Sequence, residues 1–243
     1  MRALRAQIRA ELLLTVRRGD AVLLNLAIPL GLLIFFSLVD VLPKPTGIAH
    51  PVDFLSPGIL SLAVMSTAMV SLGIATGFER QYGVLKRLGT TPLGRPRLLA
   101  AKIVAVLVIE VFQVGAIVGV AVALGWHSGG SAWPAAPAIL LGTIAFSGLG
   151  LLMAGSLRAE VTLAAANGLY LALLLLGGMV IPLAKLPGGL RSFARGLPAG
   201  ALSDALNGAL GAGAHGVPVR AWVVLSAWAA AAPLVAAFFF HWE

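Results

Sequence analysis

The chain has 243 residues, of which 59% are hydrophobic and 11% are charged, and its mean hydropathy is +0.98. This composition excludes an ordinary water-soluble domain and predicts a protein that crosses a membrane. The net charge of +8 does not indicate a nucleic-acid partner, because the basic residues lie beside apolar runs and form no continuous basic surface.

The first 20 residues predict an amphipathic helix that lies on the membrane surface. Its basic face carries Arg2, Arg5 and Arg9, and its apolar face carries Leu4, Ile8 and Leu12. Such a helix suits the anionic cytoplasmic leaflet. The alternative is a basic tail that only orients the first span. The apolar run that follows is too long for a signal peptide and has no small-x-small cleavage site after it.

Six apolar segments are long enough to cross a bilayer. They cover roughly 21–40, 56–78, 98–125, 136–157, 161–182 and 218–240. Strict alternation of polar and apolar residues is absent, which argues against a barrel. The sequence therefore predicts an all-α membrane protein, with residues 1–243 forming one transmembrane domain.

Of the 17 Lys and Arg residues, 12 lie in the amino-terminal tail and the connections that follow the second and fourth spans, and 5 lie in the connections on the other side. Because basic connections stay on the cytoplasmic side, we expect both termini to be cytoplasmic. Arginine outnumbers lysine in an Ala/Gly-rich chain, which is typical of a GC-rich bacterial genome. The expected location is therefore the bacterial inner membrane.

The connection between the fifth and sixth spans is the one long outer connection. It contains two mildly apolar pieces, Leu190 to Leu197 and Ala201 to Leu210, each too short to span. We expect short re-entrant or interfacial helices here, with their backbone ends buried in protein or facing water. The candidate residues of this outer region are Pro182, Pro187, Pro198 and Asp204.

Motifs for catalysis are missing from the sequence. No Gly-Lys pair occurs, so a phosphate-binding P-loop is excluded. The histidines are scattered, cysteine is absent, and no GxSxG, HExxH or paired-carboxylate pattern occurs. We therefore expect no catalytic residue, no metal site and no cofactor on this chain.

The connection between the second and third spans predicts a short basic helix at the cytoplasmic surface. Gly89 and Pro92 end it. Tyr82, Leu85 and Leu88 recur every three residues and would form a small apolar ridge, suitable for docking a soluble partner. The alternative is a solvated loop whose charges only fix the topology.

This connection resembles the corresponding loop of type-2 ABC transporter permeases, the ABC-2 family. The matching residues are Glu79, Arg80, Gly83, Leu85, Leu88, Thr91, Pro92 and Leu93. A second resemblance covers the end of the fifth span and the outer connection. Its matching residues are Gly177, Gly178, Pro182, Leu186, Pro187, Leu197, Pro198, Asp204, Ala205 and Leu206.

The resemblance implies an exporter built from two permease subunits, identical or homologous, and two ABC ATPase subunits that hold ATP and Mg. It implies that the connection after the second span is a coupling helix that docks on the ATPase, and that the cargo is a drug, an antibiotic or a lipid-like molecule, as in multidrug efflux. Two other functions stay open: a secondary transporter driven by protons through Glu110, and a membrane anchor or immunity protein that transports nothing.

Three of the polar residues inside the predicted spans are candidate functional residues. Glu110 lies near the middle of the third span, where an ionised carboxylate costs roughly 2.5–3.5 kcal/mol. Gln113 lies one turn on and is placed to share hydrogen bonds with it. Asn167 lies in the fifth span. These residues line either a translocation path or a subunit interface, or they are satisfied contacts between helices.

Overall fold

The computed structural model describes residues 2–17, 19–39, 51–89, 94–179, 187–211 and 216–240. Within these ranges the secondary structure is helical throughout and contains no strand. The helices are α1 (Arg2–Arg17), α2 (Gly19–Leu38), α3 (Pro51–Met65), η1 (Ser66–Ser71), α4 (Leu72–Gln81), α5 (Val84–Gly89), α6 (Arg95–Ala123), α7 (Ala135–Ser156), α8 (Ala159–Leu176), α9 (Gly188–Ala194), α10 (Pro198–Leu210) and α11 (Val219–Phe239).

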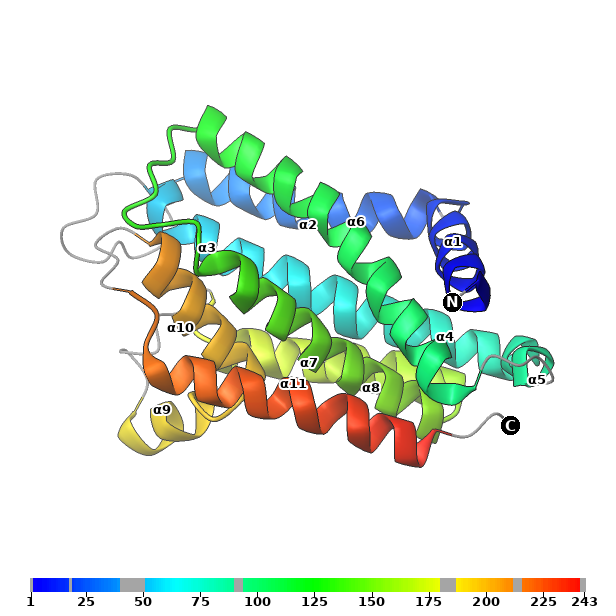
Figure 1. The fold of residues 1–243 in the computed structure, drawn as a ribbon. Helices are drawn as coiled ribbons and strands as arrows, with labels where there is room; N and C mark the ends of the chain where they lie inside the picture. Colours follow the sequence, from blue (N-terminus) through cyan, green and yellow to red (C-terminus); the bar gives the residue numbers. More distant parts are fainter. Residues whose placement is uncertain are drawn as a thin grey trace.

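The long helices form a bundle with two distinct ends (Figure 1). Helices α1 and α5 lie at one end, together with the end of α11, and α9 and α10 lie at the other. We call these the α5 end and the α10 end. At the α5 end, the amino-terminal helix contacts α6.

Five of the expected spans are helices long and apolar enough to cross a membrane. They are Pro51–Gln81, Pro96–Ala123, Ala135–Ser156, Ala159–Leu176 and Val219–Phe239. The apolar stretch found in α2, Leu23–Leu38, is shorter than these five. Five spans are therefore supported by length and composition, and the sixth stays a prediction.

Two expected span boundaries were wrong. The second span begins at Pro51, not near residue 56, and continues without a break through α3, η1 and α4 to Gln81. The fifth span ends at Leu176, not near residue 182. The reason is local: Gly177 follows the last helical residue, and Gly178 has a φ of 73°, a left-handed conformation that favours glycine.

The span formed by α3, η1 and α4 is the centre of the bundle. In the apolar stretch of this span 72% of the residues are buried, compared with 22% in α8 and 17% in α11. Close packing against α7 depends on glycine, because a Cβ added at Gly150 would lie 2.6 Å from the carbonyl oxygen of Met69. The central span is therefore fixed by backbone contact.

Helix η1 is a π-helical segment of six residues inside this span. Single π turns inside α-helices are rare, and those that occur often lie at functional sites. The segment presents Thr67, Val70 and Ser71 to a cavity described below. The irregular turn therefore coincides with a cavity wall.

The amino-terminal helix forms as expected. Helix α1 exposes Arg5, Arg9 and Arg17, while Leu4 and Ile8 are partly buried. It contacts α6 and, at its end, α2. The expected helix and its polarity are present, and its position on a membrane surface stays a prediction.

The two short pieces of the outer connection are also helical. Helix α9 has 7 residues and α10 has 13, so neither is long enough to span. Helix α10 buries an Ala-rich face against α3, α7 and α11. Re-entry of these helices into a membrane stays a prediction.

Candidate functional site

The connection between α4 and α6 contains the short helix α5. Gly83, with a φ of 71°, makes the turn that separates α4 from α5. Tyr82 is 73% exposed, but Leu85 is completely buried and Leu88 is partly buried. The expected ridge of three exposed apolar residues is therefore wrong at Leu85, which packs into the protein. Thr91 and Pro92 lie outside the described residues.

The turn still presents apolar surface, supplied by a different pair of residues. Tyr82 and Val84 are 73% and 38% exposed. The ring of Tyr82 stacks on Phe78 of α4, with ring centroids 6.1 Å apart. The exposed apolar surface of this connection is therefore formed by Tyr82 in the turn and Val84 at the start of α5, and it replaces the predicted ridge of Tyr82, Leu85 and Leu88.

A buried ionic cluster lies directly behind this connection. The Nζ atom of Lys102 lies 2.6 Å from Oε2 of Glu79 and 3.0 Å from Oε2 of Glu11. Lys102 is 1% exposed, and both glutamates are 7% exposed. We call these three residues the Lys102 cluster. It joins α1, α4 and α6 at the α5 end.

Arg80, next to Glu79, ties α4 to the opposite side of the bundle. Its Nη1 atom donates to the carbonyl oxygen of Ala154 in α7, at 3.0 Å. One residue further, the amide of Gln81 donates to Glu160 of α8 at 2.7 Å. The end of the central span is thus bonded to α6, α7 and α8, and Lys102 of α6 links it in turn to Glu11 of α1.

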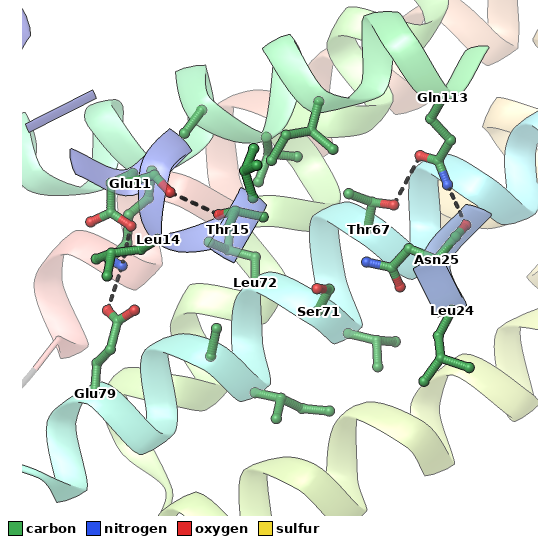
Figure 2. A pocket seen from close by; sticks show the side chains of 18 of the residues that line it. Glu11, Leu14, Thr15, Leu24, Asn25, Thr67, Ser71, Leu72, Glu79 and Gln113 are labelled. Carbon is green, nitrogen blue, oxygen red and sulfur yellow. Dashed lines mark hydrogen bonds and ion pairs between the residues drawn. The ribbon is translucent and has the colours of Figure 1, made fainter. Parts of the chain in front are cut away.

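A cavity of about 680 Å³ extends from the Lys102 cluster into the bundle. Helices α1, α2, η1, α4 and α6 form its walls. Figure 2 shows Glu11 and Glu79 at one end of the cavity and Thr67, Asn25 and Gln113 at the other. The volume falls within the range of about 300–1,000 Å³ for small-molecule sites.

Gln113 and Glu110 are both buried but bond to different helices. The hydroxyl of Thr67 donates to Oε1 of Gln113 at 2.9 Å, and Nε2 of Gln113 donates to the backbone oxygen of Asn25 at 2.7 Å. Glu110 instead contacts the hydroxyl of Thr143 on α7. The expected sharing of hydrogen bonds between Glu110 and Gln113 was therefore wrong. Gln113 lines the cavity, whereas Glu110 lies on the α7 side of α6.

Asn167 lies apart from both residues. Its amide donates to the carbonyl oxygen of Leu163, one turn earlier in α8, at 2.8 Å, and the residue is exposed. Its amide bonds to its own helix, so the expected bond to a neighbouring helix is not made. The structure brings Glu79 and Gln113 to one cavity and leaves Asn167 outside it.

The outer candidates lie at the α10 end. Pro187 precedes α9 and Pro198 begins α10. Asp204 lies 3.7 Å from Nε of Arg195, while Arg220 of α11 donates to the carbonyl oxygen of Ser192 at 3.3 Å. Burial raises the pKa of Asp204, and the charges of Arg195 and Arg220 act in the opposite direction. Pro182 lies outside the described residues.

The sequence analysis did not select three buried residues that bond the candidate residues: Glu11, Lys102 and Thr143. Lys102 counted only as a topological charge, and Glu11 stood alone among the arginines of the first helix. A signal existed for both, because an isolated charge beside an apolar run predicts a buried partner. Among the described residues no group of three His, Cys, Asp or Glu side chains is placed to hold a metal ion.

Comparison with known proteins gives two matches. The family model described as "ABC-2 type transporter" matches residues 2–210. A protein of Bacillus subtilis (strain 168) named "Putative transport permease YvfS" is 30% identical over 207 residues, which are 82% of this chain and 81% of that protein. The family match includes the α4–α6 connection and all the helices that line the cavity.

Proposed function

Because the chain belongs to the ABC-2 type transporter family and is a membrane transport permease, we propose that it is the membrane-spanning subunit of an ATP-driven exporter. It moves an amphipathic small molecule out of the cytoplasm. A separate ABC ATPase subunit, in two copies, binds ATP and Mg. A second permease, identical or homologous, completes the complex in the bacterial inner membrane, with both termini cytoplasmic.

The observation that carries this proposal is the attachment of the α4–α5 junction. The central span runs directly into the turn before α5, and its last residues bond to three other helices, α6, α7 and α8. A displacement of α5 by a soluble partner would therefore move the end of the central span and the helices bonded to it. This is the mechanical requirement for coupling ATP hydrolysis to a rearrangement of the bundle.

The docking surface in this proposal is Tyr82 with Val84, the exposed apolar residues at the start of α5. The double change Tyr82→Asp and Val84→Asp removes apolar contact and adds charge at the interface. We expect it to lower co-purification of the ATPase with the permease about tenfold or more. Leu85 is a poor choice for this test because an aspartate there would be buried in the permease itself.

The matched control is Trp133→Asp, an aromatic residue that is 85% exposed in the connection before α7. It makes the same kind of change outside the proposed interface and should leave ATPase association unchanged. If the Tyr82 and Val84 variant folds and keeps full association and transport, docking at this surface is excluded. If no ATPase co-purifies with the wild type, the anchor or immunity function is favoured.

One observation favours the proton-driven alternative. Oε1 of Glu110 is buried and has no hydrogen-bond partner within the described part of the chain. A carboxyl group at this depth is a candidate for moving a proton across a membrane. The two functions differ in their energy source, so transport after ATP depletion separates them.

A further inference from the structure

Most polar groups that line the cavity are already bonded within the protein. Lys102 bonds both glutamates, and Gln113 bonds Thr67 and the backbone of Asn25. The hydroxyl of Thr15 donates to the carbonyl oxygen of Glu11 at 2.8 Å. These groups shape the cavity and have little capacity left for a ligand.

Two polar side chains in the middle of the cavity have no such bond. The amide of Asn25 and the hydroxyl of Ser71 line the cavity, and neither has a hydrogen-bond partner among the residues that the structure describes. Asn25 comes from α2 and Ser71 from η1, so they belong to different walls (Figure 2). Both are only partly buried. Their donors and acceptors are therefore available to a molecule in the cavity.

Connectivity places these two groups in the same part of the cavity. Gln113 bonds the backbone of Asn25 on one side and Thr67 on the other, and Ser71 follows Thr67 at the end of the π-helical segment. The uncommitted amide and hydroxyl thus lie close to one hydrogen-bonded bridge, which Gln113 makes between Thr67 and the backbone of Asn25 (Figure 2). Thr67, Val70 and Ser71 share this wall because residues three and four apart lie on one face of a helix.

The rest of the lining is apolar and reaches the outer surface of the bundle. Leu24 and Phe112 line the cavity and are 58% and 75% exposed. In a bilayer these side chains contact acyl chains, so the cavity is continuous with the hydrocarbon region.

We propose that the cavity is a binding site for an uncharged amphiphile drawn from the lipid layer. Its apolar body fills the space between α2 and α6, and a hydroxyl, ester or amide group bonds Asn25 and Ser71. The charged groups of the Lys102 cluster are bonded to one another, and the two uncommitted groups, Asn25 and Ser71, are neutral, which favours a ligand with a neutral polar group. This site lies within one chain and does not require the ATPase or a second permease.

The test uses the purified permease alone in phosphatidylcholine nanodiscs with a photoactivatable diacylglycerol, an uncharged amphiphile with ester and hydroxyl groups. We expect saturable crosslinking to peptides of α2, η1, α4 or α6 that line the cavity. Unlabelled dioleoylglycerol should compete, and hexadecane, which has no polar group, should not. The combined change Asn25→Leu and Ser71→Ala should reduce the saturable signal roughly fivefold or more.

The control is Asn167→Leu, the same change at an exposed amide of α8 outside the cavity, which should leave the signal unchanged. If Asn25→Leu prevents folding, Ser71→Ala removes a single hydroxyl and gives the same answer. Crosslinks spread over α8 and α11 without saturation, equal competition by hexadecane, or an undiminished signal in the folded variants would each overturn the site. Because no ATPase is present, failure here leaves the exporter proposal untouched.

Discussion

The two ends of the bundle hold their charges in opposite ways. At the α5 end the Lys102 cluster is almost fully buried, with contacts of 2.6 and 3.0 Å. At the α10 end Arg195 and Asp204 lie 3.7 Å apart, with side chains 41% and 31% exposed. An exposed pair contributes about 0–1 kcal/mol, whereas removing one partner of a buried pair costs about 3–5 kcal/mol. The buried charges join three helices, whereas the pair at the α10 end is only partly buried and keeps contact with solvent.

The largest effect should follow from Lys102→Met. It leaves Glu11 and Glu79 buried without their shared cation, which we expect to lower the free energy of unfolding by about 3–5 kcal/mol. The measurement is the thermal unfolding temperature in detergent, with protease sensitivity of α1 as a local readout. Helix α1 should be cleaved more readily than in the wild type.

The comparison variant is Arg195→Met, which removes the cation of the exposed pair. We expect a change of less than about 1 kcal/mol. Equal losses in the two variants would show that both ends depend on their charges to the same degree. The contrast between the ends would then have to be abandoned.

Glu110 provides an intermediate case, because it is buried but contacts a hydroxyl group and no cation. Glu110→Gln keeps the size and can still bond Thr143, so we expect a stability change of about 1 kcal/mol or less and nearly full transport. Transport is measured in proteoliposomes with the ATPase present. A variant that folds and binds the ATPase but loses transport, together with wild-type transport that survives ATP depletion, would favour proton coupling.

The smallest effect concerns pH and the α10 end. Since burial raises the pKa of Asp204 in the folded protein, its favourable contribution to stability is present below the unfolded pKa of about 4. That contribution is lost as pH rises through the higher folded pKa. We expect the unfolding temperature of the wild type to fall slightly over this window relative to Asp204→Asn. A rise would mean that Arg195 and Arg220 outweigh burial.

The sequence predicted the helices better than their partners. Five spans were found within a few residues at most boundaries, because continuous apolar runs depend only on local composition. The predicted span bounds differ from the helix bounds at two places. The helix of the second span begins at Pro51, and the helix of the fifth span ends at Leu176, before a pair of glycines. The presence of α1, α9 and α10 was predicted from the same local signals.

The site was harder to predict because its contacts join distant parts of the chain. Glu79 was selected for its resemblance to a coupling loop, but its bond to Lys102 crosses 23 residues and the bond from Lys102 to Glu11 crosses 91. Spacing along one helix placed Glu110 beside Gln113, yet neighbouring helices drew their side chains apart. The periodicity of a sequence shows which residues share one face of a helix, but it does not show which neighbouring helix packs against that face.

The Lys102 cluster also bears on the order in which the protein is made. A ribosome completes Glu11 long before it completes Lys102, which lies 91 residues later. During that interval α1 lacks the cation that holds its carboxylate in place, and Glu79 has yet to be made for most of it. The Lys102 cluster therefore forms only after the start of α6 has been synthesised, so the contact between the amino-terminal helix and α6 is completed later than the helices that lie between them in the sequence.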